Sequence, residues 1–307
     1  MKTLVILCCI LFTSLSVQAA EVLKIGTLLI EDVVPMYVAE QEGLYSQQGI
    51  KVELVPFLSA LERDSALTAG AIDGALSDPV GSILLDQGRN QVKITSLCLG
   101  KTPQEGVFAI LAAPKSDLKT IEQLKGVPIA VSNATIIEYV TDRLLVEQGF
   151  SEEEIEKIEI KKMPIRMQML LSGAVKAATL PEPLASVART KGAIQILADD
   201  QAAESLSQTV LIFRSQVLEQ RKDDVSRFFA AYGKAVELIN ASPETYRALF
   251  VEKGRIPPDL ASNYPIPTYP PPQPFSISLY APVMDWLTAK GVVKPVAYEY
   301  MVYGDFL

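Results

Sequence analysis

Two stretches of the sequence decide the fold: Leu67-Thr68-Ala69-Gly70-Ala71-Ile72-Asp73-Gly74-Ala75-Leu76-Ser77-Asp78-Pro79 and Leu170-Leu171-Ser172-Gly173-Ala174-Val175-Lys176-Ala177-Ala178-Thr179-Leu180-Pro181-Glu182-Pro183. Each stretch reads as a helix end, a glycine stop, a short strand of small residues, and an acid-proline pair that begins another helix. The second copy has one extra residue before its acid. This agreement in order and spacing predicts two lobes of similar construction.

Strand-like and helix-like segments alternate on both sides of this repeat. Strands are expected at 22–28 and 50–57 before the first copy, with a helix beginning at Pro35 between them. The same alternation restarts at 107–112 and continues to a strand at 194–198. Alternation of this kind is typical of an α/β fold in which helices cover a mainly parallel sheet. The sequence therefore predicts two doubly wound α/β lobes.

Two strands, 107–112 and 209–213, are expected to cross between the lobes. This interpretation assigns residues 21–111 and 209–307 to a discontinuous lobe 1 and residues 112–208 to lobe 2. The proline-rich segment 265–274 cannot form regular structure. It is expected either to run over the surface or to line the cleft between the lobes.

The N-terminus has the features of a secretory signal. Lys2 precedes an apolar run that is too short to span a bilayer, and small residues allow cleavage near Ala19 or Ala20. We therefore expect residues 1–20 to be a signal peptide and the mature protein to be periplasmic. The pair Cys8-Cys9 leaves a lipid anchor as the alternative. The remaining cysteine, Cys98, lies in an apolar strand-like run and is expected to be buried.

The composition excludes several classes of function. The chain contains no histidine, which excludes Ser-His-Asp and Cys-His catalysis and every histidine-based metal site. We therefore expect no enzyme activity, no cofactor and no bound metal. An enzyme that uses Glu182 or Asp78 as its general base is the alternative. Removal of Lys2 with the signal takes the net charge from −8 to −9, which argues against nucleic acid as a partner.

The loops after the predicted strands form the candidate binding site. Ligands of an open parallel sheet bind at the carboxyl ends of its strands, where helix N-termini also point free N–H groups. If the lobes face each other, three such loops from each lobe converge on one cleft. The candidate solute-binding residues are Glu31, Asp32, Ser59, Ser77, Asp78, Ser132, Asn133, Thr135 and Glu182.

Several of these residues also have a purely structural interpretation. Asp78 and Asn133 can each cap the helix that follows them. Glu31 and Asp32 can complement the dipole of the helix that begins at Pro35. Glu182 is a poor helix cap, so contact with the solute is favoured for it. Arg166 either reaches the cleft or forms a pair on a helix surface, which is the favoured interpretation.

The charges of these loops predict the class of solute. Acids predominate, with only Arg166 opposing them, and burying several carboxylates around an anion would be costly. This pattern favours a neutral or cationic nitrogen-containing solute, such as an aminopyrimidine. A sulfonate or another small anion is the alternative.

The segment 35–55 resembles the opening signature of a transport family. The family comprises the ABC-transporter solute-binding proteins for alkanesulfonate, taurine, nitrate and thiamine-precursor pyrimidines. Further landmarks are 69–73, 118–126, 171–177 and Glu182-Pro183. The resemblance implies a type II periplasmic binding protein fold that delivers a small solute to a membrane permease, and we expect a monomer.

The resemblance also has consequences for the site and for the alternatives. The family's ligand loops fall on Glu31-Asp32, Ser77-Asp78, 132–135 and Glu182 of this chain. Some relatives are enzymes that make the thiamine pyrimidine with an active-site histidine, which this chain lacks. A solute sensor on the same fold is the remaining alternative, and members share a frame while differing in solute.

Overall fold

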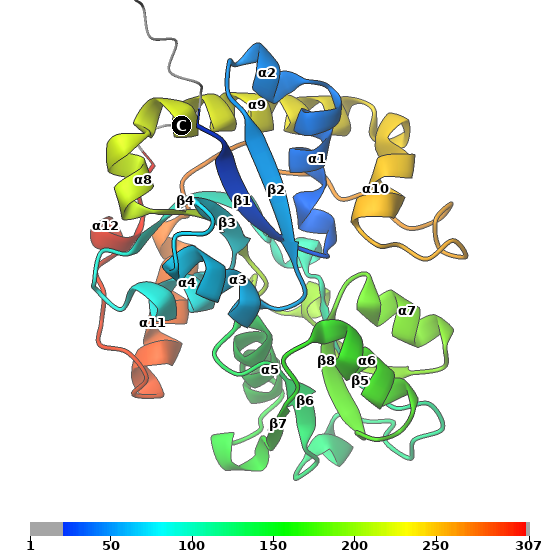
Figure 1. The fold of residues 1–307 in the computed structure, drawn as a ribbon. Coiled ribbons are helices and arrows are strands. Elements are labelled where there is room, and N and C mark those ends of the chain that lie inside the picture. The colour runs from blue at the N-terminus through cyan, green and yellow to red at the C-terminus, as the bar shows by residue number, and fades with distance from the viewer. Residues whose placement is uncertain (1–20, 305–307) are drawn as a thin grey trace, which may run out of the picture.

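A computed structural model describes residues 21–304, so the predicted signal peptide lies outside the described residues. The described chain forms two α/β lobes, one above the other in Figure 1, each built on a five-stranded sheet. The two sheets have the same design. Each combines four strands of one direction with a single antiparallel strand, which confirms the predicted mainly parallel sheets.

The sheet of lobe 1 has the order β2-β1-β3-β10-β4. Strands β1 and β2 run parallel, as do β1 and β3, while β10 is antiparallel to both β3 and β4. The strands are β1 Leu23–Leu28, β2 Val52–Phe57, β3 Gly74–Ser77, β4 Val92–Leu99 and β10 Thr209–Arg214. Cys98 on β4 is buried, as expected.

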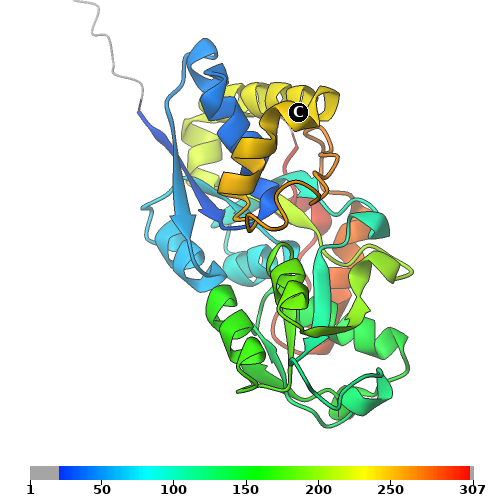
Figure 2. The same cartoon turned by 90° about the vertical axis from the view of Figure 1, so that its right-hand side faces the viewer.

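Two groups of helices cover this sheet (Figures 1 and 2). One group packs around the long helix α9, whose Phe228 and Tyr232 stack within the core. It comprises α1 Val34–Gln41, α2 Leu44–Gln47, α8 Ser215–Gln220, α9 Lys222–Ala241 and α10 Arg247–Lys253. The other group faces lobe 2 and comprises α3 Ala60–Thr68 and α4 Pro79–Asp86.

The sheet of lobe 2 has the order β7-β6-β8-β5-β9. Its strands are β5 Phe108–Ala112, β6 Ile129–Val131, β7 Lys157–Glu159, β8 Ala177–Pro181 and β9 Ile194–Ala198. Its helices are α5 Ile136–Glu147, α6 Met163–Leu171 and α7 Leu184–Thr190.

The position of β5 corrects the predicted lobe boundary. All of β5 pairs with β8 and β9, so residues 108–111 belong to the second sheet and not to lobe 1. The chain crosses between the lobes in the two segments before β5 and β10. These segments pass so closely that a Cβ on Gly106 would lie 2.5 Å from the Asp200 nitrogen. A Cβ on Gly100, which has φ +84, would lie 2.3 Å from the Ser207 carbonyl oxygen.

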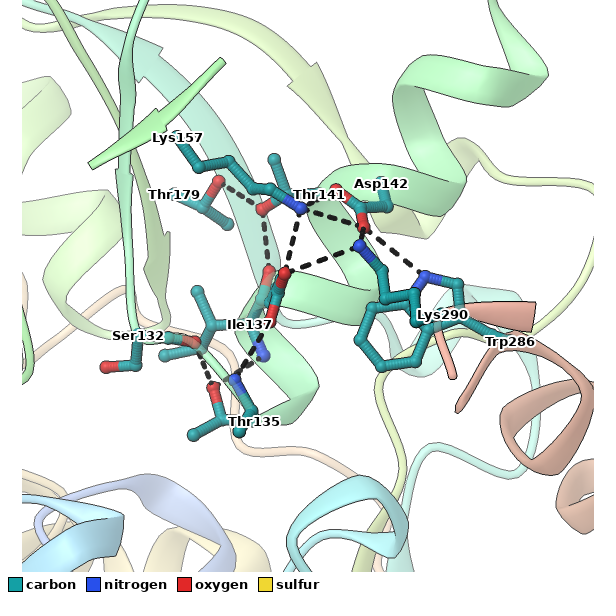
Figure 3. Close-up of polar contacts among 11 residues, drawn as sticks. Ser132, Thr135, Ile137, Thr141, Asp142, Lys157, Thr179, Trp286 and Lys290 are labelled. Carbon is teal, nitrogen blue, oxygen red and sulfur yellow. Dashed lines mark hydrogen bonds and ion pairs between the residues drawn. The ribbon is translucent and has the colours of Figure 1, made fainter. Parts of the chain in front are cut away.

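The C-terminal helix α11, Ile277–Ala289, contacts both lobes. It packs on α4 of lobe 1, and its Trp286 meets Tyr139 of α5 edge to face in lobe 2. Figure 3 shows the ionic network beside this contact: Asp142 of α5 lies 2.7 Å from Lys157 Nζ and 2.8 Å from Lys290 Nζ. Residues 209–304, predicted as part of lobe 1, therefore do not pack on lobe 1 alone.

The remaining C-terminal segments follow the sheet edge of lobe 1. Residues 265–274 are irregular, as predicted, and Gln273 donates its backbone N–H to Ser96 Oγ at the edge strand β4. A last short helix is α12, Tyr298–Met301. Within residues 21–304, every helix is too short or too polar to cross a membrane.

Candidate functional site

A cavity lies between the two lobes and encloses about 540 Å³, including its open mouth. Lobe 1 supplies one wall and lobe 2 the other, with most of the lining apolar and a set of polar groups on both sides. The lining residues are Leu28, Ile30, Ser59, Ala60, Arg63, Leu76, Ser77, Asp78, Phe108, Ser132, Thr135, Ile136, Ile137, Lys161, Met163, Pro181 and Thr209. A concave, mainly apolar site with a few convergent polar groups is typical of small-molecule binding.

The lobe 1 wall contains Ser59, Ser77 and Asp78 of the predicted residues. Ser59 caps α3, because its side chain accepts the Glu62 N–H, and Ser77 ends β3. Asp78 caps α4 as predicted: its Oδ1 accepts the Gly81 N–H at 2.7 Å. Asp78 thus caps its helix and lines the cavity as well.

The surroundings of Asp78 bring the pKa of its carboxyl group closer to neutral pH. Burial raises the pKa of Asp78 to about 6, against the lowering effects of the nearby Arg63 charge and of hydrogen bonds from the Gly81 and Ile136 N–H groups. Ile136 begins α5, so the Asp78 carboxylate of lobe 1 lies at a helix N-terminus of lobe 2. The acid is therefore ionised at neutral pH and gains protons in mild acid.

The lobe 2 wall contains Ser132 and Thr135. Thr135 Oγ1 accepts the Ile137 N–H and donates to the Ser132 carbonyl, so Thr135 is the cap of α5. The prediction that Asn133 caps this helix is wrong. Asn133 is exposed and lines an outer groove that shares Ser59, Ser132 and Thr135 with the cavity. The β6–α5 turn thus brings two hydroxyl groups into the cavity and leaves the amide at its mouth.

Three predicted acids lie behind the cavity instead of lining it. Their neighbours Ile30, Pro181 and Thr209 form this part of the wall. Thr209 Oγ1 donates to Asp32 Oδ1 at 2.6 Å, and burial raises the pKa of Asp32. Glu31, Asp32 and Glu182 are thus outside the cavity lining, and the lining residue Thr209 contacts Asp32.

Glu31 is the most perturbed of these acids. Burial, and secondarily the Asp32 charge, raise the pKa of Glu31 to about 8, so this carboxyl group is mostly protonated at pH 7. Tyr269 donates its hydroxyl to the Glu31 backbone carbonyl, which ties the proline-rich segment to this part of lobe 1. No residue of the segment 265–274 is part of the cavity lining.

Glu182 has partners from lobe 2 and from the C-terminal region. Its carboxylate lies 2.6 Å from Arg189 Nη2 and accepts the Ser186 N–H, so it does serve the first turn of α7 despite its poor capping propensity. Tyr264 of the C-terminal region donates its hydroxyl to the same carboxylate at 3.3 Å. The Glu182 carboxylate is therefore engaged by these partners, and the residue is not part of the cavity lining.

Two buried arginines occupy equivalent positions of the repeat. Arg63 on α3 and Arg166 on α6 have no exposed surface, which corrects the expectation of a surface pair for Arg166. Each donates its Nη1 to a carbonyl 13 residues further on, Arg63 to Leu76 and Arg166 to Thr179. Arg63 lines the cavity, whereas Arg166 lies behind Ser132. Sequence reasoning missed Arg63, although extending the repeat by four residues pairs it with Arg166.

The comparisons with known proteins agree with this geometry. The family model described as NMT1/THI5 like matches residues 30–246, which is more than half of the chain. A putative aliphatic sulfonates-binding protein of Bacillus subtilis (strain 168) is 23% identical over 208 residues. That match covers 66% of this chain and 61% of the relative, which is less than two thirds of the relative's length.

Two solved structures show the same fold. The ligand binding component of an ABC-type import system from Staphylococcus aureus, with zinc bound, has a TM-score of 0.77 and 18% identity, covering 93% of this chain and 97% of its own. The alkanesulfonate-binding protein SsuA from Xanthomonas axonopodis pv. citri, bound to MOPS, has a TM-score of 0.76 and 18% identity, covering 90% and 96%. The two-lobed architecture is thus the periplasmic binding protein fold, and the chain belongs to the NMT1/THI5-like family.

Proposed function

We propose that this protein is the periplasmic solute-binding component of an ABC importer, which captures a sulfonate or a related small organic solute and delivers it to a membrane permease. The observation that supports this most is the cavity whose walls come from both lobes. A solute held there contacts both walls only when the lobes are closed, so binding favours the closed state. The printed functions of the Bacillus and Xanthomonas relatives support the solute class.

The lining suits a solute with an apolar body and one polar group. Phe108, Met163 and Ile137 offer apolar surface, while the hydroxyl groups of Ser59, Ser132 and Thr135 gather at helix starts. The helix N-termini at these positions favour an anionic group. The acids that argued against an anion bear less on the choice, because Glu31, Asp32 and Glu182 lie outside the lining.

A nitrogen heterocycle with N–H donors, such as an aminopyrimidine, is the second candidate. Asp78 supports it, because this carboxylate is the one acidic side chain among the cavity-lining residues of the described chain. A carboxylate can accept hydrogen bonds from an amino group, and it repels an anion.

A thermal-shift panel of alkanesulfonates, taurine, nitrate and aminopyrimidines tests the proposal. We expect an alkanesulfonate at 100 times its Kd to stabilise the protein by about 2.7 kcal/mol. Small-angle scattering should show compaction with the same compound, and mass spectrometry should recover it unchanged. Product formation would favour an enzyme. If no compound in the panel stabilises or compacts the protein, the capture function is contradicted.

A further inference from the structure

Two buried polar atoms on the lobe 1 wall of the cavity have no hydrogen-bond partner within the described residues. They are Nη2 of Arg63 and Oγ of Ser77. Both residues line the cavity, and their exposed fractions are 0% and 3%. Leaving a buried polar group unpaired is unfavourable, so such atoms are rare in native proteins and each needs an explanation. These two lie on the same cavity wall, where a bound group can reach them.

The side chain of Arg63 is fixed by its other nitrogens. Nε donates to Asp64 Oδ1 at 2.8 Å, and Nη1 donates to the Leu76 carbonyl at 2.9 Å. Nη2 lies 2.8 Å from the same Asp64 oxygen but makes no hydrogen bond of its own. The guanidinium group is therefore held rigidly in the cavity wall, with Nη2 ion-paired to Asp64 but without a hydrogen bond.

The equivalent arginine of lobe 2 has no unpaired nitrogen. Arg166 donates Nε to the Ile160 carbonyl and Nη1 to the Thr179 carbonyl. Its Nη2 donates to Ser132 Oγ and to the Ile160 carbonyl. The repeat thus places the same buried side chain in both lobes, and only the copy that lines the cavity lacks one hydrogen bond.

The chemistry of the two unpaired atoms indicates the kind of group that they bind. A guanidinium N–H can only donate, and a serine hydroxyl can donate as well, so an acceptor-only group satisfies both. Oxyanions such as sulfonate and carboxylate are acceptor-only groups, and arginine binds them through charge-assisted hydrogen bonds. The adjacent acids are Asp64, which already pairs with Arg63, and Asp78, which is ionised at neutral pH and takes up a proton in mild acid.

We propose that Arg63 Nη2 and Ser77 Oγ form the subsite for the oxyanion head group of the solute. This inference rests on the proposed function, because it names the part of the solute that the captured molecule presents to lobe 1. The apolar remainder of the solute then extends toward Phe108 and Met163. Lobe 1 recognises the charge, and lobe 2 closes over the rest.

Isothermal titration of butanesulfonate into the full mature chain tests the subsite. Arg63→Gln removes the charge and should weaken binding about 10- to 100-fold. Ser77→Ala removes one neutral donor and should weaken binding roughly 3- to 10-fold. Arg214→Gln and Ser215→Ala change an arginine and a serine of lobe 1 outside the cavity lining, and both should retain the wild-type affinity.

The outcomes separate this inference from the proposed function. If Arg63→Gln folds and binds butanesulfonate as tightly as the wild type, the subsite is wrong. If Arg63→Gln does not fold, unchanged affinity of Ser77→Ala overturns the subsite instead. Binding of an aminopyrimidine but of no anion by the wild type would overturn the subsite while solute capture stands. Binding of nothing in the panel would overturn both.

Discussion

Arg63 in lobe 1 and Arg166 in lobe 2 hold the same position of one repeated motif, 103 residues apart, but they meet different surroundings. Every side-chain nitrogen of Arg166 donates a hydrogen bond within lobe 2. The acceptors Ser132, Ile160 and Thr179 connect β6, β7 and β8. Arg63 lines the cavity, and its Nη2 is ion-paired with Asp64 but makes no hydrogen bond. The comparison shows that two copies of one repeated motif can place the same residue in different surroundings. In lobe 2 the arginine connects strands, whereas in lobe 1 it lines the cavity.

The acids of the two lobes differ in the same way. Glu31 of lobe 1 is buried, and burial raises its pKa to about 8. Glu182 of lobe 2 lies 2.6 Å from Arg189, whose positive charge compensates the negative charge of Glu182. Neither acid lines the cavity, so the charge that a solute meets comes mainly from Arg63, Asp78 and Lys161.

Removing the supporting arginine should have the largest effect on stability. Arg166→Met leaves the carbonyls of Ile160 and Thr179 without their donor, so we expect the free energy of unfolding to fall by about 3 to 5 kcal/mol. Urea unfolding followed by circular dichroism measures this. A loss below about 1 kcal/mol would mean that the hydrogen bonds of Arg166 do not stabilise lobe 2, and would contradict the structural role that distinguishes Arg166 from Arg63.

The buried acid of lobe 1 should make stability depend on pH. The pKa of Glu31 is about 8 when folded and 4.5 ordinarily, so the unfolded chain releases this proton first as the pH rises. This group's contribution is full below pH 4.5 and is lost as the pH rises to 8. Glu31→Gln should therefore raise the free energy of unfolding at pH 8 by about 2 to 4 kcal/mol.

Glu182→Gln is the matched change in lobe 2. It removes the ion pair with Arg189, so we expect it to give no gain in stability at pH 8. Urea titrations of both variants at pH 5 and pH 8 compare the two lobes. A similar gain in both variants would contradict the distinction between a buried acid and a paired one.

The affinity for a sulfonate should fall as the pH rises. The pKa of Asp78 is about 6, and an anion bound at Arg63 favours the protonated form of this acid. We expect binding of butanesulfonate to weaken roughly threefold to tenfold between pH 5.5 and pH 7.5. Asp78→Asn, which can still cap α4, should remove this dependence in calorimetric titrations. Affinity that rises with pH would favour a cationic solute instead.

The contact between α11 and α5 should contribute least. Lys290 is only one-quarter exposed and pairs with Asp142 and Glu138, so Lys290→Ala should cost about 1 kcal/mol or less. Lys234→Ala removes an exposed pair with Glu237 and should cost close to nothing. Urea unfolding in low and high salt compares the two variants. Equal small decreases in the free energy of unfolding would mean that the ion pairs of α11 do not stabilise its contact with lobe 2.

The architecture could be predicted because its signals are local. Glycine stops, proline starts and alternating strands and helices are visible within about ten residues, and the repeat extends them to two lobes. The lobe boundary was misplaced because strand pairing is not local. Nothing within 107–112 indicates that β5 pairs with β8 and β9, which follow it by many residues.

The site was predictable only in part for a related reason. The positions after β3 and β6 were found by the sheet rule, and the structure places Ser77, Asp78, Ser132 and Thr135 on the cavity wall. Glu31 and Glu182 follow the same rule but are not part of the cavity lining. Tyr269 binds the Glu31 backbone carbonyl and Arg189 pairs with Glu182, contacts that the sequence does not reveal. Arg63 was missed because an arginine on a helix usually faces solvent.

A crystal structure with the alkanesulfonate that most stabilises the protein tests the central claim most directly. The account predicts a solute enclosed between the lobes, with its sulfonate oxygens within hydrogen-bond distance of Arg63 Nη2 and Ser77 Oγ and its alkyl chain against Phe108 and Met163. A solute bound outside this cavity, or enclosed there with its sulfonate turned away from Arg63 and Ser77, would contradict it.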